Sequence, residues 1–190
     1  MPPKIKFTQE MVIDTAFEIV RCDGWPALSA RNIANKLNSS VGPIYSYVKS
    51  MGALEGKLLG RAYRLLYQYM TEPRTDDRAL DRGVGYVLFA RDEKNLFECF
   101  IDKKFAAQRR PYSEQLWQSL DDEISIHSRY RGLTKEKFEQ HRRKMVTFTY
   151  GLAVLIHTGF LDVDMGEKQI IELLRETGEM LLAGLRTSLE

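Results

Sequence analysis

The sequence predicts an all-α protein, and three observations support that fold class. Apolar residues recur at spacings of three and four along the whole chain, as they do on one face of a helix. Only six of the 190 residues are proline, so few positions oppose a helix. Hydrophobic residues make up 44% of the chain, which is enough for a packed core and argues against disorder.

Four helices are predicted in the first 70 residues because four side chains there can cap a helix: Thr8, Ser29, Ser40 and Ser50. These helices end at about residues 22, 37, 48 and 69. Asp23-Gly24 stops the first, and Asn38, which tolerates the left-handed conformation, follows the second. The residues expected to face inward are Val12, Ile13, Ala16, Phe17, Val20, Ile33, Ala34, Leu37, Val41, Ile44 and Val48.

Five longer helices are expected after the polar linker that begins at Glu72-Pro73-Arg74. They are predicted at about 77–91, 94–107, 111–129, 134–158 and 166–189. Arg110-Pro111, Arg131-Gly132 and the segment from Asp162 to Gly166 mark the last three breaks. The chain is therefore divided into a module of short helices at residues 1–48 and a bundle of longer helices at 49–190, about nine helices in all.

Residues 39–50, SSVGPIYSYVKS, predict a very short helix with an unusual outer face. With Ser40 as the cap, Gly42 and Pro43 lie in the first turn, where proline is tolerated. At 100° per residue the outward-facing residues are Gly42, Pro43 and Ser46, flanked by Tyr45 and Tyr47 and followed by Lys49. Such a surface suits close approach to a DNA major groove ~12 Å wide.

The preceding helix and its turn complete a helix-turn-helix, and Arg31 lies in the first turn of that helix. From there Arg31 could reach a base edge or a phosphate. A surface turn and a short helix without a DNA-binding role would give the same spacing, so that alternative stays open.

The run LSARNIANKLNSSVGPIYSYVKSMGAL, residues 28–54, resembles the N-terminal helix-turn-helix of the tetracycline-repressor (TetR) family of bacterial transcription regulators. The resemblance covers about residues 8–56. The matching positions are Ala16, Glu18, Gly24, Trp25, Ile33, Ala34, Ser40, Gly42, Ile44, Tyr45, Tyr47, Val48 and Ser50. It implies an N-terminal DNA-binding domain and a C-terminal domain for effector binding and dimerisation.

Carried over by position, the resemblance implies that Arg31, Pro43, Tyr45 and Tyr47 contact DNA. It also implies that Ser40, Gly42 and Lys49 lie at the DNA backbone, with Ser46 on the same outward face. After Ser50 the family commonly has a phosphate-binding lysine and an acidic residue, whereas this chain has Met51-Gly52. Lys49, or the N–H groups of the fourth helix, would have to replace that contact.

The last helix predicts a homodimer. A helix of about eight residues reads few base pairs, and two copies ~34 Å apart on a palindrome solve this. The apolar stripe of helix 166–189 is wider than a surface helix of a monomer needs, so with helix 134–158 it could form an intersubunit four-helix bundle. The predicted interface residues are Phe148, Leu152, Ile156, Ile170, Leu174, Gly178, Leu181 and Leu185. Burial within one subunit is the alternative.

The middle of the chain is rich in aromatic residues at helical spacing, a pattern that a plain core also shows. Gly83 and Gly85 lie within a predicted helix, where they either allow close helix contact or leave room for a small molecule. The resemblance favours an effector pocket here, and the aromatic residues make an apolar or aromatic ligand the expected one. The predicted pocket residues are Tyr86, Phe89, Phe97, Phe100, Asp102, Trp117, Tyr150 and His157.

Gly52, Gly56 and Gly60 recur every four residues along the helix that joins the DNA reader to the bundle. One interpretation is close packing against a neighbouring helix. The other is that the glycines keep this helix soft, so that ligand binding can shift it and change the spacing of the two readers.

The charge distribution is weak support for nucleic-acid binding. Residues 1–70 carry nine Lys/Arg and five Asp/Glu, a balance of +4, against +2 for the whole chain. Lys4 and Lys6 could form a short basic arm.

Other function classes are disfavoured. No HExxH, GxSxG, P-loop or GxGxxG motif is present, and His141 and His157 lie about 160° apart on one helix, so we expect no enzyme, cofactor or metal site. Cys22 and Cys99 lack metal-ligand spacing, and the N-terminus lacks the apolar segment of a signal peptide, so we expect a soluble, cytoplasmic protein.

The sequence thus predicts a dimeric DNA-binding transcription regulator, a repressor released from a palindromic operator by a small apolar or aromatic ligand. One alternative is a dimeric helical adaptor of the same fold that acts through protein contacts without specific DNA binding. Another is a DNA-binding protein without a small-molecule effector.

Overall fold

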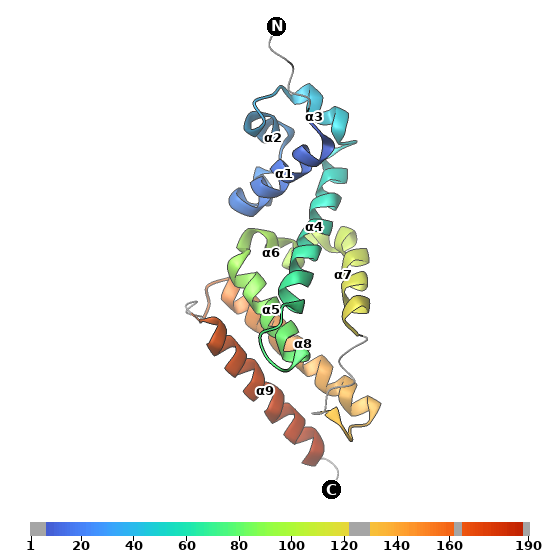
Figure 1. The fold of residues 1–190 in the computed structure, drawn as a ribbon, viewed down its shortest axis with the longest axis vertical. Coiled ribbons are helices and arrows are strands. Elements are labelled where there is room, and N and C mark those ends of the chain that lie inside the picture. The colour runs from blue at the N-terminus through green and yellow to red at the C-terminus, as the bar shows by residue number, and fades with distance from the viewer. Residues whose placement is uncertain (1–6, 122–129, 162–164, 188–190) are drawn as a thin grey trace. The chain divides into compact units, whose positions relative to one another are not determined.

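The computed structural model describes residues 7–121, 130–161 and 165–187, and in these ranges it is all-α, as predicted. Figure 1 shows the helices in chain order. The described elements are α1 (Gln9–Asp23), η1 (Trp25–Ala27), α2 (Ala30–Lys36), α3 (Val41–Tyr47), α4 (Met51–Thr71), α5 (Arg78–Asp92), α6 (Lys94–Ile101), η2 (Lys103–Phe105), α7 (Ala106–Asp121), α8 (Lys135–His157) and α9 (Glu167–Thr187), where η denotes a 3₁₀ helix.

The chain divides into two compact units by its internal contacts. Unit 1 comprises residues 1–64 and 93–113, and unit 2 comprises residues 65–92 and 114–190. Helices α4 and α7 each contribute residues to both units. The predicted boundary at residue 48 separates a DNA-binding domain from an effector-binding and dimerisation domain. It is a division by function, not by internal contacts, and it stays a prediction.

The predicted capping residues begin several of these helices. Thr8 Oγ1 accepts a hydrogen bond from Met11 N at 3.2 Å, and Ser50 Oγ accepts one from Ala53 N at 3.1 Å. Thr134, which is not among the predicted caps, accepts a hydrogen bond from Lys137 N at 3.3 Å at the start of α8. Gly24, with φ of 82°, ends α1, as the Asp23-Gly24 pair predicted. Because a cap involves groups only three residues apart, these boundaries depend on local sequence.

Unit 1 is held together by polar contacts between α1 and the segment that begins at Glu93. Arg21 donates two hydrogen bonds to the buried Glu93 carboxylate, with Nε to Oε2 at 2.8 Å and Nη2 to Oε1 at 2.5 Å. The Asn95 side chain donates to the carbonyls of Arg21 and Cys22 and so caps the end of α1. The Trp25 and Phe105 rings pack 4.6 Å apart in the same core.

In unit 1 the first half of α4 also contacts α1 through Arg61. Arg61 of α4 forms ion pairs with Glu10 and Asp14 of α1, and its guanidinium lies 5.9 Å from the centre of the Phe17 ring. These contacts hold the first half of α4 against α1.

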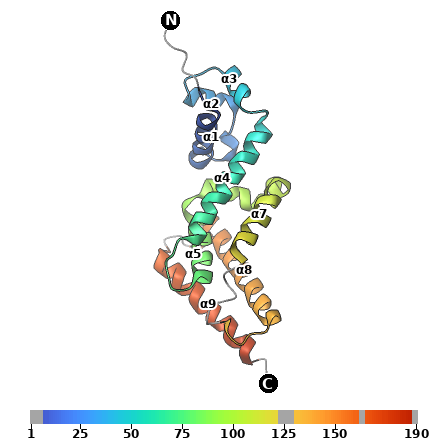
Figure 2. The same ribbon diagram turned by 45° about the vertical axis from the view of Figure 1, so that its right-hand side comes forward.

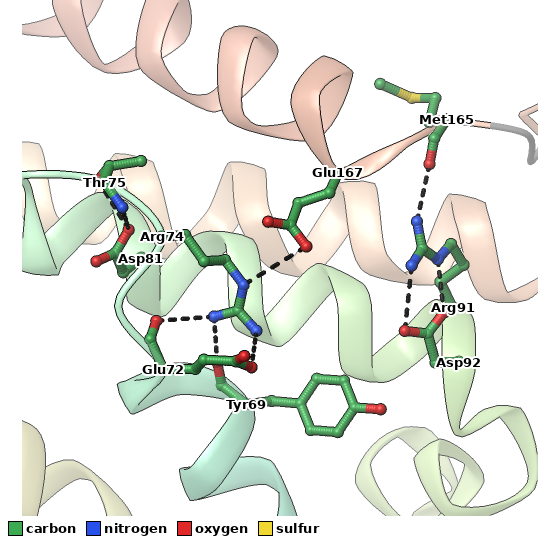
Figure 3. A network of polar contacts seen from close by, with 9 residues as sticks. All are labelled: Tyr69, Glu72, Arg74, Thr75, Asp81, Arg91, Asp92, Met165 and Glu167. Atoms are coloured by element: carbon green, nitrogen blue, oxygen red, sulfur yellow. Dashed lines mark hydrogen bonds and ion pairs between the residues drawn. The ribbon is translucent and has the colours of Figure 1, made fainter.

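Helix α5 is the centre of unit 2, and α8 and α9 pack against it and against each other (Figures 1 and 2). From Leu80 to Ala90 nearly every residue of α5 is buried. The predicted polar linker after α4 is an ordered loop here. The Arg74 guanidinium donates to the carbonyls of Tyr69 and Glu72 and lies 3.8 Å from the Glu167 carboxylate at the start of α9 (Figure 3).

The N-terminus of α5 and the end of the α8–α9 connection are fixed by further polar contacts. Asp81 Oδ1 accepts hydrogen bonds from both N and Oγ1 of Thr75, and Arg91 Nη1 donates to the carbonyl of Met165 at 3.1 Å (Figure 3). Asp77 Oδ1 accepts from the N–H groups of Ala79 and Leu80 and so caps α5.

The predicted break at Arg110-Pro111 is wrong, because α7 runs through Pro111 and the break lies at Asp102 instead. Arg109 Nη1 donates to the carbonyls of Cys99, Phe100 and Asp102, which terminates α6 after Ile101. Pro111 is exposed near the start of α7, where the loss of a single helical hydrogen bond is tolerated. The second half of predicted helix 111–129, from residue 122, lies outside the described residues.

Candidate nucleic-acid interface and ligand cavity

Helices α2 and α3 form a helix-turn-helix in unit 1, joined by residues 37–40. Ser29 Oγ accepts a hydrogen bond from Asn32 N at 3.1 Å and caps α2. Asn38 has φ of 50°, the left-handed conformation that the sequence predicted there, and the Ser39 N–H donates to the carbonyl of Ala34 at 2.9 Å. Ser40 occupies the N-cap position of α3, but its side chain makes no capping hydrogen bond, contrary to the prediction.

The outer face of α3 is open to solvent. The exposed residues among those predicted to meet DNA are Arg31, Ser40, Gly42, Pro43, Tyr45, Ser46 and Lys49, and Tyr47 is half-buried. Ile44 and Val48 are buried, as predicted, whereas the prediction that Val41 packs inward is wrong, since its side chain is 37% exposed. Val41 lies in the first turn of a seven-residue helix, where the core does not extend far enough to cover it. Leu37, also predicted to face inward, is half-buried.

Helix α3 is anchored at its C-terminus by the start of α1. Gln9 Nε2 donates to the carbonyl of Tyr47 at 2.6 Å, and Val48 N donates to the carbonyl of Ile44 at 3.2 Å. These contacts, with the burial of Ile44, hold the outward face of α3 in one orientation relative to α1.

The helix-turn-helix carries only positive charge. Residues 28–50 contain Arg31, Lys36 and Lys49 and no carboxylate. Lys36 lies 3.4 Å from Asp23. In the described ranges no hydrogen bond or ion pair engages the side chains of Arg31 or Lys49, so both are available to a phosphate or a base edge.

The N-terminus of α4, which follows the helix-turn-helix in the chain, has backbone N–H groups that can donate hydrogen bonds. Ser50 Oγ accepts from Ala53 N at 3.1 Å, and the carbonyl of Ser50 accepts from Leu54 N. The N–H groups of Met51 and Gly52 lie in the first turn, where a helix provides no backbone acceptor, and Gly52 is exposed. An anion can therefore bind at this helix end without a lysine side chain.

Unit 2 contains a cavity of about 150 Å³. Its wall combines aromatic and aliphatic side chains with three buried polar ones, Arg82, His141 and Thr149. The lining residues are Met70, Ala79, Leu80, Arg82, Gly83, Tyr86, Trp117, Leu120, Tyr130, Phe138, His141, Arg142, Met145, Val146, Thr149, Tyr150, Leu174 and Gly178.

Three of the eight predicted pocket residues, Tyr86, Trp117 and Tyr150, line this cavity. Phe89 is fully buried in unit 2 and makes an edge contact with the Tyr69 ring, and His157 is half-buried at the end of α8. Phe97, Phe100 and Asp102 belong to unit 1. Aromatic spacing does not distinguish core side chains such as Phe89, Phe97 and Phe100 from cavity-lining ones, and Asp102 and His157 entered the prediction as polar contacts to the ligand.

Asp102 has a structural role instead. Its Oδ1 accepts a hydrogen bond from Lys104 N at 2.8 Å, and its carbonyl accepts one from Arg109. Phe100 packs against the Tyr63 ring at 4.6 Å in the core of unit 1.

Sequence analysis missed the buried polar residues of the cavity. Arginine is usually exposed and histidine is intermediate in burial, so residue type alone did not indicate that Arg82 and His141 are buried. Their positions follow from the packing of α5 against α8, which brings together residues about 60 apart in the chain.

Most of the predicted dimer residues are covered by their own chain. Leu152, Ile156, Ile170, Leu174, Gly178 and Leu185 are buried within unit 2, and only Phe148 and Leu181 are half-exposed. The wide stripe on α9 is therefore used largely for packing inside the subunit. A dimer contact would need further exposed apolar side chains of α8 and α9 beside Phe148 and Leu181.

Such side chains are present. Leu155 is 37% exposed and Met180 is 73% exposed, and both are apolar residues on α8 and α9. At 100° per residue Leu155 lies about 20° from Phe148 on α8, and Met180 lies about 100° from Leu181 on α9 with Leu173 and Thr177 between them. Each helix thus keeps an uncovered apolar strip beside its buried face.

No group of three or more His, Cys, Asp or Glu side chains in the described part of the chain could hold a metal ion. None of the described helices is long and apolar enough to span a membrane.

The described residues form an all-α protein in which α2 and α3 make a helix-turn-helix. No protein-family model matches the sequence. The chain is 26% identical over 190 residues to the uncharacterized HTH-type transcriptional regulator YobS of Bacillus subtilis (strain 168), an alignment that covers 97% of this chain and 96% of that protein. The similarity extends through both units and is not confined to the helix-turn-helix.

Proposed function

We propose that this protein is a DNA-binding transcription regulator of the TetR family that acts as a repressor. It binds a palindromic operator as a homodimer and releases it when a small apolar or aromatic ligand enters the cavity of unit 2. The observation that carries the proposal is the open, carboxylate-free face of α2 and α3, with Arg31, Tyr45 and Lys49 exposed. The nearly full-length similarity to an HTH-type transcriptional regulator supports the same class.

In this mechanism α3 enters the major groove with its small residues foremost. Gly42 and Pro43 let the helix approach the base edges closely, and the Tyr45 and Ser46 hydroxyls supply hydrogen-bonding groups. Arg31 and Lys49 bind phosphates or base edges on either side. The free N–H groups of Met51 and Gly52 provide the phosphate contact that the family commonly makes with a lysine.

The dimer in this mechanism uses the uncovered apolar strips of α8 and α9. They contain Phe148 and Leu155 on α8, and Leu173, Met180 and Leu181 on α9. Two strips from each subunit would form a four-helix contact and set the separation of the two readers.

The test is selection from a pool of random DNA duplexes, followed by sequencing of the survivors. We expect the wild-type chain to enrich a palindrome whose half-sites lie about one helical turn or a multiple of it apart. Tyr45→Ala should abolish the enrichment. Tyr67→Ala, which removes a similarly exposed tyrosine from α4 outside the reader, is the matched control and should leave the selected sequence unchanged.

A folded dimer that enriches no sequence at low salt would contradict the proposal. That result would favour the second candidate, a dimeric helical adaptor of the same fold that acts through protein contacts. The residue that favours this candidate is Met51, which stands where a phosphate-binding lysine is common in the family.

A further inference from the structure

Gln9, the first residue of α1, links that helix to the C-terminal end of α3. Its side-chain Nε2 donates a hydrogen bond to the carbonyl of Tyr47 at 2.6 Å. Tyr47 is the last residue of α3, and the carbonyls in the last turn of a helix have no partner within that helix. Gln9 therefore supplies a donor to α3 from a helix that lies 38 residues away in the chain.

Helix α3 needs contacts of this kind because it is too short to be stable alone. It has seven residues, and isolated helices shorter than about 12 residues are marginal in water. In the described chain its N-cap residue, Ser40, makes no side-chain capping hydrogen bond. Burial of Ile44 and Val48 fixes which face of α3 points inward, but apolar burial is non-directional and leaves the tilt of the helix less restricted. The directional hydrogen bond to Tyr47 restricts that tilt.

Helix α1 is itself held in place by two further sets of contacts. Arg61 of α4 forms ion pairs with Glu10, which directly follows Gln9, and with Asp14. One face of α1 is buried in the core of unit 1 through Val12, Ile13, Ala16, Ile19 and Val20. The start of α1 therefore binds both α3 and α4, and it sets the orientation of α3 within unit 1.

A change in the tilt of α3 affects base contacts and phosphate contacts differently. A hydrogen bond from Tyr45 or Ser46 to a base edge forms only at about 2.5–3.2 Å between donor and acceptor, and it weakens steeply with angle. The attraction of Arg31 or Lys49 to phosphates falls only with the inverse of distance. A misoriented α3 therefore loses sequence discrimination and keeps most of its sequence-independent attraction to DNA.

We propose that Gln9 is a positioning residue for operator recognition. Its hydrogen bond to Tyr47 holds α3 at the tilt from which Tyr45 and Ser46 reach base edges, and Gln9 itself reads no base. This role rests on the proposed function, because it concerns how the helix-turn-helix distinguishes one DNA sequence from another. It adds a specificity-determining residue that lies on α1, outside the helix-turn-helix.

The test measures two affinities of the full chain by fluorescence anisotropy at several salt concentrations. The probes are the operator obtained by selection and a scrambled duplex of the same length. Gln9→Met keeps the length of the side chain and removes the donor without adding a charge. We expect it to weaken operator binding about tenfold, the scale of a lost base contact, and to change binding of the scrambled duplex by less than about twofold. The slope of log affinity against log salt concentration should stay the same.

Gln108→Met is the matched control, since it removes an exposed glutamine of unit 1 near the start of α7, and it should change neither affinity. Gln9 is exposed, so Gln9→Met should fold like the wild-type chain, which circular dichroism checks. A direct contact of Gln9 with a phosphate would give a different result. Gln9→Met would then weaken both duplexes alike and lower the salt slope by about 0.9, which would overturn the positioning role.

Different results would refute this positioning role and the proposed function. If the wild-type chain selects a palindrome and Gln9→Met discriminates between the duplexes equally well, only the positioning role is refuted. If the wild-type chain selects no duplex, the regulator is refuted, and the positioning role with it.

Discussion

Gly83 and Gly85 differ by two residues in sequence and have different reasons to be glycine. A Cβ atom on Gly85 would lie 2.0 Å from the carbonyl oxygen of Tyr69 and 2.7 Å from Cα of Met70, so the end of α4 touches the backbone of α5 there. Gly83 lines the cavity, and its nearest neighbour would be Leu174 Cδ1 at 3.4 Å. Of the two predicted reasons, close helix packing explains Gly85, and room for a ligand at Gly83 stays a prediction.

This difference predicts opposite tolerance to alanine. Gly85→Ala should lower the free energy of unfolding by about 3 kcal/mol, because backbone atoms on both sides must move. Gly83→Ala should change it by less than about 1 kcal/mol, since its Cβ meets only side chains and alanine favours the helix. Urea unfolding followed by circular dichroism measures both. Equal stability of the two variants would show that α4 does not contact α5 at Gly85.

Ionisation of the Tyr63 hydroxyl makes the free energy of unfolding depend on pH in the alkaline range. Burial raises the pKa of its hydroxyl to about 12, so between pH 10 and 12 the folded protein keeps a proton that the unfolded chain has released. We expect the ionisation of Tyr63 to lower the free energy of unfolding by about 1 kcal/mol per pH unit in this window, less than the ~1.4 of a fully buried group.

The comparison with Tyr63→Phe isolates this effect, because burial also raises the pKa of the Cys99 thiol and adds a separate loss of stability at high pH. Urea unfolding at several pH values should give a shallower decline for Tyr63→Phe. Parallel curves for the two proteins would contradict the assignment to Tyr63.

At the scale of single elements, the glycines of α4 have different surroundings. A Cβ on Gly60 would lie 3.1 Å from the Tyr112 ring of α7, which is the close packing that the sequence offered as one interpretation. Gly56 is different, since no atom lies within 4 Å of its added Cβ, and its carbonyl accepts a hydrogen bond from the Tyr112 hydroxyl at 2.8 Å. Close packing therefore explains Gly60 but not Gly56.

Gly56→Ala should raise the free energy of unfolding by about 1 kcal/mol, because alanine favours the helix and meets no obstacle. Gly60→Ala should gain less, since the Tyr112 ring must shift. If α4 is kept soft for regulation, Gly56→Ala should also weaken the release of DNA by ligand, measured by fluorescence anisotropy of a labelled operator. Unchanged release together with higher stability would refute the softness hypothesis.

At the scale of the whole molecule, the uncovered apolar strips of α8 and α9 determine the expected assembly. Met180→Glu should raise the dissociation constant of the dimer at least tenfold, because it places a charge in the proposed apolar contact, and it should not affect folding, since Met180 is 73% exposed. Sedimentation equilibrium measures the mass. Glu179→Ala, at the neighbouring exposed position, is the control and should remain dimeric; dissociation of both variants would point to a different interface.

The sequence by itself determined the helical class and most helix boundaries of the described residues. Thr8, Ser29 and Thr134 begin helices, and Gly24 and Asn38 end them, through contacts between groups a few residues apart. The outward direction of the α3 face was also predictable, because Ile44 and Val48 fix the buried side by helical spacing. Capping and periodicity are local properties, so they can be read without the fold.

Tertiary structure decided where α6 ends, which stripe of α9 is covered, and what lines the cavity. Arg109 terminates α6 from another helix, and Pro111 is tolerated in α7 because it is exposed near the helix start. Arg82 lies on the cavity wall because α5 packs against α8. These outcomes depend on contacts between residues far apart in sequence, and hydrophobic periodicity gives the apolar face of a helix but not the partner that covers it.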